Sequence, residues 1–197
     1  MANMTKKKNT RSSKLPKGAK MVFKGKIFEV WQWRQKMFDG SFATFERVRR
    51  PDTATVVPIV GNKILMIEEE QPGKGHYFGF PGGRIDEGEG ELAAAKRELL
   101  EETGMISKEW KLLFAEEPVN KMVWTIYTYV ARDCAKIQKP MLDPGERIRT
   151  KLISFEQFLK LYKNRRFREG EMGRLILQAQ YDKEYRNLLK RLLFGKK

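Results

Sequence analysis

Hydrophobic and polar positions change their period several times along the chain, which predicts strands that alternate with helices. Strong helix formers predict a helix over residues 91–103 with Gly104 as its stop, and helical periodicity returns late in the chain. These patterns predict an α/β domain of the mixed α+β kind. The predicted strands cover residues 27–33, 41–49, 53–60, 63–69, 110–117, 122–131 and 147–153, and the later helices cover 155–162, 172–180 and 183–193.

Composition divides the chain into four parts. Residues 1–20 carry seven basic and no acidic side chains, which is typical of a disordered tail. Residues 21–52 are expected to form antiparallel strands, residues 53–165 the main domain, and residues 166–197 basic helices. Inside the main domain, residues 71–90 contain seven glycines and predict a long loop, and long loops in compact domains are usually functional.

The net charge of +15 is distributed unevenly. Residues 144–197 have a net charge of +9 (fifteen basic, six acidic), whereas residues 61–120 have −6 (seven basic, thirteen acidic). An acidic centre in a basic protein indicates a metal site, because clustered carboxylates repel each other until a cation neutralises them. The basic ends could attract nucleic acid, and a solvated tail and helix face are the simpler interpretation.

The rarest residues exclude several classes of site. A single cysteine excludes an intramolecular disulfide framework and favours a reducing compartment, so we expect a cytoplasmic protein. The apolar runs are too short for a membrane-spanning helix, and no membrane partner is expected. The single histidine, His76, excludes zinc sites built from several histidines and is assigned no catalytic role. Carboxylates are therefore expected to carry the chemistry.

Three glutamates crowd one surface of the predicted helix over residues 91–103. Glu98, Glu101 and Glu102 are separated by three or four positions, a spacing at which like charges destabilise a helix. Hard oxygen donors in this arrangement suit Mg²⁺ or Mn²⁺. Gly82 and Gly83, shortly before the helix, allow the backbone to approach a ligand closely.

These residues resemble the sequence motif of the Nudix family, which is called the Nudix box, and match it at nine positions with the spacing intact. The resemblance implies an α/β/α sandwich with a mixed sheet. It also implies hydrolysis of a nucleoside diphosphate linked to another group, with Mg²⁺ or Mn²⁺ as cofactor. The matching positions are Gly83, Glu89, Arg97, Glu98, Leu99, Glu101, Glu102, Gly104 and Met105.

The resemblance also implies roles for single residues. The expected metal ligands are Glu98, Glu101, Glu102 and the carbonyl of Gly82, and the expected catalytic residues are Glu101, Glu102 and Glu146. Glu101 and Glu146 are both candidates for the base. Arg97 and Glu89 are expected to hold the helix and the loop in position.

Residues 22–165 resemble ADP-ribose and ADP-sugar pyrophosphatases, which implies a homodimer built with the N-terminal strands and a nucleoside diphosphate sugar as substrate. Trp31 and Trp33 share one strand face and are candidates to stack a nucleobase, with core packing as the alternative. Arg49 and Arg50 are candidates for contact with the diphosphate, and simple surface exposure is their alternative.

Two other functions stay open. The basic ends and the Pro81-Gly82-Gly83 form of the box entry favour a Nudix hydrolase of nucleoside triphosphates or capped RNA. A Nudix-like module that senses a nucleotide without cleaving it is the third possibility. The complete set of Glu98, Glu101 and Glu102 argues against this third function, because a binding module needs no clustered metal carboxylates.

Overall fold

The computed structural model describes residues 15–167 and 170–195. The first strand, β1 (Lys20–Lys24), begins one residue before the predicted boundary, and most of the predicted disordered tail lies outside the described residues. None of the helices in the described ranges is long and apolar enough to span a membrane.

Among the described residues the main sheet has seven strands, and five of them follow one another in the order β13-β5-β4-β11-β9. β11 runs parallel to β4 and the other neighbours are antiparallel, so the sheet is mixed, as the sequence predicts. Two short strands extend it, because β6 (Gly75–Gly79) pairs with β5 and β7 (Gly82–Arg84) pairs with β4. The five strands are β4 (Thr53–Val60), β5 (Lys63–Gln71), β9 (Glu109–Glu116), β11 (Ile126–Arg132) and β13 (Arg147–Ile153).

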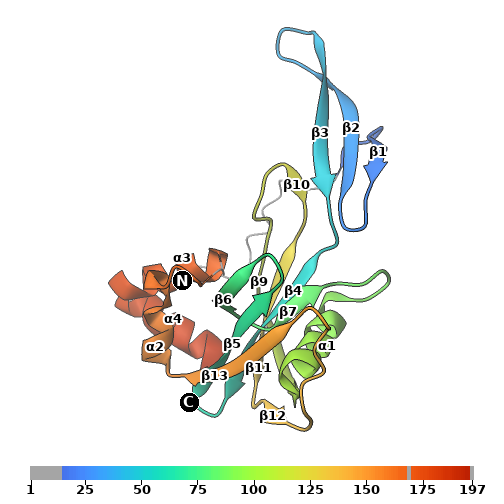
Figure 1. Cartoon of the computed structure of the whole chain (residues 1–197). Coiled ribbons are helices and arrows are strands. Elements are labelled where there is room, and N and C mark those ends of the chain that lie inside the picture. Colours follow the sequence, from blue (N-terminus) through green and yellow to red (C-terminus); the bar gives the residue numbers. More distant parts are fainter. Residues whose placement is uncertain (1–14, 168–169, 196–197) are drawn as a thin grey trace.

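Helices cover both faces of this sheet (Figure 1). α1 (Glu91–Thr103) packs on the face that presents Ala54 and Val56 of β4. α2 (Phe155–Leu159), α3 (Gly170–Tyr181) and α4 (Lys183–Phe194) pack on the opposite face, which presents Val57 and Ile59. Successive side chains of β4 therefore point into two separate hydrophobic cores, one on each face of the sheet. The expected α/β/α sandwich is confirmed.

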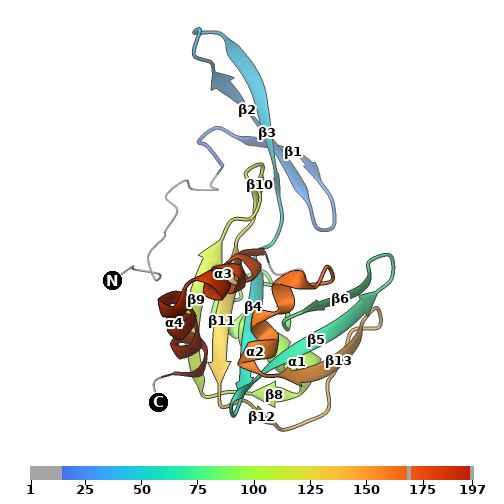
Figure 2. The same ribbon diagram turned by 90° about the vertical axis from the view of Figure 1, so that its left-hand side faces the viewer.

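A second sheet projects away from the sandwich (Figures 1 and 2). It contains β1, β2 (Glu29–Lys36) and β3 (Phe42–Arg49), which are antiparallel, and β10 (Met122–Val123), which is parallel to β3. The chain enters the main domain through residues 50–52. The chain passes between the two sheets a second time at residues 124–125. There Thr125 N–H donates to Asp52 Oδ1 at 2.8 Å, and this hydrogen bond joins the two connecting segments.

Three predicted elements are wrong in part. The glycine-rich stretch over residues 71–90 is not one long loop, because β6 and β7 form within it by pairing with buried strands. The predicted strand over residues 122–131 is two strands, because the chain leaves the projecting sheet at Trp124 and joins the main sheet at Ile126. The predicted helix over residues 155–162 ends at Leu159, and a 3₁₀ turn (η1, Leu161–Lys163) follows. A small pair, β8 (Met105–Ile106) with β12 (Ala135–Lys136), closes the end of α1.

Candidate active site

Helix α1 presents two buried glutamates beside its apolar face. Ala94, Ala95 and Leu99 are fully buried against the sheet, and Glu98 and Glu102 follow on the same side with 9% and 4% exposure. The helix ends at Gly104, whose φ of 70° lies in the left-handed region. A Cβ at that position would come 2.0 Å from the carbonyl oxygen of Gln138, so only glycine fits there.

The glycines of β7 lie directly against these carboxylates. Gly82 N–H donates to Glu102 Oε2 at 2.9 Å. A Cβ on Gly83 would come 2.3 Å from Glu98 Oε1, so the absence of a side chain makes the space in which Glu98 lies. The loop and the helix of the Nudix-like box therefore meet through backbone and carboxylate contacts.

Arg97 joins the loop to the helix. Its guanidinium donates to both carboxylate oxygens of Glu89, at 3.1 and 3.0 Å, and to the Arg84 carbonyl oxygen at 2.9 Å. It also donates to Glu98 Oε1 at 2.8 Å and to Glu101 Oε2 at 3.0 Å. Three carboxylates and a carbonyl around one guanidinium fix the geometry of the helix start and raise the pKa of Arg97.

A further acidic pair lies on the neighbouring strand and loop. Glu69 of β5 is only 3% exposed and accepts hydrogen bonds from Tyr77 Oη and Gln71 Nε2. Gln71 Nε2 also lies 3.5 Å from Glu146 Oε1, which brings the loop before β13 to this edge of the site. Sequence analysis missed Glu69. Its signal was an acidic run, residues 68–70, that continues a buried strand, so that one of its glutamates must face the interior.

The electrostatics show four carboxylates crowded together. Burial, followed by repulsion from Glu98, raises the pKa of Glu102 to about 9, and Glu69 and Glu146 add to the effect. Burial also raises the pKa of Glu98, and burial and then Glu69 raise the pKa of Glu146. This crowding is the electrostatic signature of a site that a cation would stabilise.

The donor set fits a divalent cation of the Mg²⁺ class. Carboxylate and carbonyl oxygens are the ligands such ions prefer, and the missing side chain of Gly83 lets the Glu98 carboxylate lie directly against the β7 backbone. In the arrangement that the structure describes, no three acidic, histidine or cysteine side chains enclose a common point. Glu98 and Glu101 instead engage Arg97, and Glu102 engages the Gly82 backbone. Glu98 and Glu102 with the Gly82 carbonyl are the residues that would hold the ion.

The two candidate arginines have different surroundings. Arg50 lies over the ring of Trp124, with its guanidinium carbon 4.4 Å from the centroid, and its Nε is buried with no hydrogen-bond partner. Burial and then the nearby charge of Arg84 lower the pKa of Arg50. Arg84 sits on β7 next to Gly83, so Arg50 belongs to the neighbourhood of the box. Arg49 is exposed at the end of β3.

The two candidate tryptophans lie elsewhere. Trp31 and Trp33 are half-buried on β2, in the projecting sheet, and belong to neither core of the sandwich. Their indole N–H groups donate to Glu29 Oε2 at 2.9 Å and to Gln35 Oε1 at 3.1 Å. Within one copy of the chain, the strand that carries them, β2, lies in the projecting sheet and away from α1 (Figure 1).

Comparison with known proteins decides the family. The family model of the NUDIX domain matches residues 49–175, which is more than half of the chain. The chain belongs to the Nudix family. The resemblance to the Nudix family that the sequence indicates is thereby confirmed, and the chain is similar to relatives named as an ADP-ribose pyrophosphatase and an ADP compounds hydrolase.

The chain is similar to the following three relatives and one solved structure. A methanol dehydrogenase activator from Bacillus methanolicus is 27% identical over 165 residues, covering 81% of this chain and 87% of the relative. An ADP-ribose pyrophosphatase from Bacillus subtilis is 24% identical over 170 residues, with 81% and 88% covered. The ADP compounds hydrolase NudE of Escherichia coli is 35% identical over 86 residues, with 42% and 46% covered. A crystal structure of an ADP compounds hydrolase has the same fold, with a TM-score of 0.69, 23% identity, and 83% and 90% covered.

Proposed function

We propose that this Nudix protein hydrolyses the diphosphate of ADP-ribose or a related nucleoside diphosphate sugar to AMP and a sugar phosphate. The observation that carries the proposal is the group of buried carboxylates on α1 and β5, placed beside Gly82 and Gly83 and flanked by Arg50 and Arg84. Negative groups that would hold cations and positive groups that would hold phosphates lie together beside β7, at the start of β4. The named activities of the Bacillus subtilis and Escherichia coli relatives support the substrate class.

The residues divide the work as follows. Glu98, Glu102 and the Gly82 carbonyl would hold Mg²⁺ or Mn²⁺, with Glu101 beside them. When bound, such an ion neutralises the diphosphate and lowers the pKa of a water molecule. The guanidinium of Arg50 donates to a phosphate oxygen, and the neighbouring Arg84 adds a second positive charge. Glu146 or Glu101 accepts the proton of the attacking water.

The projecting sheet supports a homodimer. Several of its large apolar side chains are exposed, among them Phe23, Phe28, Phe42 and Phe45. Exposed apolar patches of this kind mark protein–protein contact sites. A second copy that covers this sheet would place Trp31 and Trp33 at the rim of a neighbouring active site, where they would stack on the nucleobase.

Product analysis tests the proposal. ADP-ribose, ADP-glucose, other nucleotide sugars, deoxynucleoside triphosphates and capped RNA are incubated with the protein and Mg²⁺, with Glu102→Gln as the matched inactive variant. Preferential release of AMP from ADP-ribose, lost in the variant, supports the proposal. Preference for triphosphates or capped RNA would overturn the substrate class.

A second candidate function comes from the relative named as an activator. The match to the methanol dehydrogenase activator extends over most of both chains, which supports a role in which a bound nucleotide acts on a partner protein. The same panel separates the two functions. Nucleotide that binds without turnover of any substrate would favour the binding module.

A further inference from the structure

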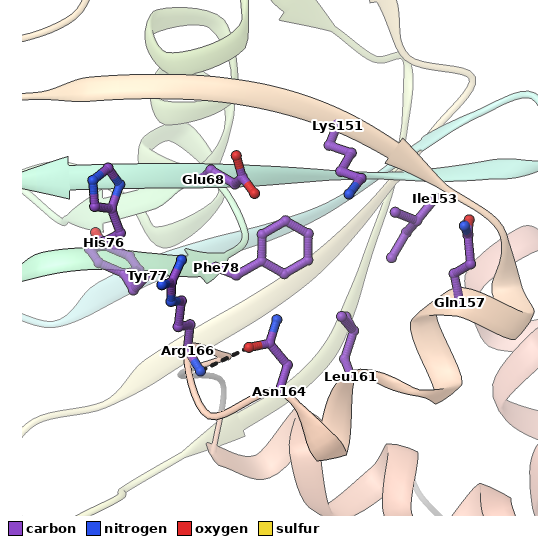
Figure 3. A pocket seen from close by; sticks show the side chains of 10 residues that line it. All are labelled: Glu68, His76, Tyr77, Phe78, Lys151, Ile153, Gln157, Leu161, Asn164 and Arg166. Atoms are coloured by element: carbon purple, nitrogen blue, oxygen red, sulfur yellow. Dashed lines mark hydrogen bonds between the residues drawn. The ribbon is translucent and has the colours of Figure 1, made fainter.

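Two residues that the proposed function does not use, Gln71 and Tyr77, lie against the buried carboxylate of Glu69. Gln71 is the last residue of β5, and Tyr77 lies on β6. These strands are antiparallel neighbours, and their register places Tyr77 opposite Glu69. Tyr77 also lines a hollow between β6 and the segment after η1 (Figure 3). The ring of Tyr77 therefore borders the hollow, whereas its hydroxyl donates to Glu69.

The pairing of β13 with β5 brings Glu146 to the same place. In this antiparallel pair Arg147 lies opposite Glu70. Continuing the register by one residue on each strand places Glu146 opposite Gln71, and directly opposite side chains are neighbours. Because side chains alternate along a strand, Gln71 shares its face of β5 with Glu69. Gln71 is therefore next to Glu69 along its own strand and next to Glu146 across the pair.

The side-chain amide of Gln71 joins these two carboxylates. Its Nε2 donates to Glu69 Oε1 and lies 3.5 Å from Glu146 Oε1. The other oxygen of Glu69, Oε2, accepts a hydrogen bond from the Tyr77 hydroxyl. An amide nitrogen carries two N–H donors, so that Nε2 can serve both carboxylates at once. A continuous chain of contacts therefore leads from Tyr77 to Glu146.

The two ends of this chain differ in how firmly the fold holds them. Glu69 is 3% exposed and lies inside β5, which has neighbours on both sides. Glu146 lies in the turn before β13, where its backbone N–H donates to the Asp143 carbonyl oxygen at 2.9 Å. Glu69 and Glu146 are also close enough for their charges to repel each other. The Gln71 amide between them offsets this repulsion and links the turn to a buried strand.

We propose that Gln71 is a positioning residue, which holds the Glu146 carboxylate at the hydrolytic site while Glu69 and Tyr77 hold Gln71. This inference rests on the proposed function, in which Glu146 is one of two candidates to accept the proton of the attacking water. A general base must lie within hydrogen-bond distance of the proton that it takes, and a small displacement of such a group costs much of the rate. Removal of the Gln71 amide therefore slows the catalytic step and leaves substrate binding nearly unchanged.

Kinetics of Gln71→Met test this role, because the substitution keeps the length of the side chain and removes its N–H donors. Turnover with Mg²⁺ is measured on whichever compound of the substrate panel the wild type hydrolyses. We expect kcat to fall by about tenfold or more and KM to change by less than about twofold. In a Glu146→Ala background the same substitution should change kcat by less than about twofold, whereas in Glu101→Gln it should cost the full factor.

Urea unfolding in EDTA provides a second measurement, which does not require turnover. The unfolding equilibrium constants of the wild type, Gln71→Met, Glu146→Ala and the double variant form a thermodynamic cycle. We expect the combined effect to differ from the product of the single effects by about threefold or more, because the two side chains are in contact. Gln178→Met is the matched control on an exposed position of α3, and its effect should combine with Glu146→Ala without any coupling.

The two measurements separate this inference from the function on which it rests. A wild type that hydrolyses none of the compounds would overturn the proposed function, and the unfolding cycle would then decide whether Gln71 holds Glu146. Unfolding effects that simply multiply would overturn the positioning role. So would a rise in KM alone, or an equal loss of kcat in the wild-type and Glu146→Ala backgrounds. Tyr77→Phe, which removes the far end of the chain, is expected to give a smaller loss of kcat and replaces Gln71→Met in both measurements if that variant does not fold.

Discussion

Gly83 and Glu98 fit together so closely that a side chain at position 83 would have to displace the Glu98 carboxylate. A Cβ on Gly83 would come 2.3 Å from Glu98 Oε1 and 2.7 Å from its carboxyl carbon. The missing side chain of Gly83 therefore provides the space that the Glu98 carboxylate occupies. The backbone around Gly83 is the short strand β7, which is paired with β4.

Gly83→Ala is expected to displace the Glu98 carboxylate and to lower kcat by about a hundredfold or more, because the expected metal ligand would leave its position. The measurement is turnover of ADP-ribose together with circular dichroism of the variant. Gly90→Ala is the control, since nothing lies within 4 Å of its added Cβ. Equal activities of the two variants would contradict the assignment of Glu98.

The glycine at the end of α1 has a structural role that can be measured separately. Gly104→Ala is expected to lower the free energy of unfolding by about 2–4 kcal/mol, because its φ of 70° and the Gln138 carbonyl both exclude a side chain. Urea unfolding provides the value. Gly173→Ala in α3, where the added Cβ meets open space, is expected to be neutral or stabilising. A similar loss of unfolding free energy in both variants would contradict a specific requirement for glycine at the end of α1.

The sequence was sufficient for the box helix and for much of the site. Residues 91–103 are strong helix formers bounded by glycines, and local propensity determines both ends of α1. Local spacing also identifies Glu98 and Glu102, because both lie on a single helix. Long-range pairing explains what was missed. The glycine-rich stretch forms β6 and β7 only because these segments pair with β5 and β4. This pairing depends on the tertiary structure and cannot be recognised from the local sequence.

The position of Glu69 and the separation of the two arginines depend on tertiary structure as well. Glu69 joins the site because its strand pairs with β6, which brings the Tyr77 hydroxyl to it, and because the loop with Glu146 comes to the same place. Arg49 and Arg50 are adjacent in sequence, and only the crossing between the sheets places one against Trp124 and leaves the other exposed. Sequence reasoning treated these two arginines alike.

Arg50→Ala is therefore expected to raise KM for ADP-ribose by about tenfold, whereas Arg49→Ala changes it by less than about twofold. The difference arises because Arg50 lies beside Arg84 of the box, whereas Arg49 is exposed at the end of β3 in the projecting sheet. Steady-state kinetics on both variants give the comparison. A larger effect of Arg49→Ala would reverse the assignment.

The pH dependence of stability is expected to report on Glu102. Its pKa is raised to about 9 in the metal-free fold, against about 4.3 in an unfolded chain. Between these values the folded protein holds a proton that the unfolded chain has lost. This contribution to stability is complete below about pH 4.3 and is lost as the pH rises through about 9.

Metal-free protein should therefore lose up to about 1.4 kcal/mol of stability per pH unit between pH 6 and pH 8 from this group. Glu102→Gln, which stays uncharged, should show a flatter dependence, and Mg²⁺ should bind the wild type more tightly as the pH rises. Urea unfolding in EDTA at both pH values provides the test. Parallel curves for wild type and variant would mean that Glu102 is already ionised without metal.

The proposed homodimer can be tested on the projecting sheet. Phe45→Asp is expected to convert a dimer into a monomer, because it places a charge on an apolar surface that a second copy would cover. Leu112→Asp on β9 is the matched control, since Phe45 and Leu112 are 41% and 42% exposed. Light scattering after size-exclusion chromatography measures the mass. If Trp31 and Trp33 complete the partner's site, the monomer should also show a raised KM while its box remains intact. A monomeric wild type, or a dimer that persists in Phe45→Asp with unchanged kinetics, would show that the projecting sheet is not the interface.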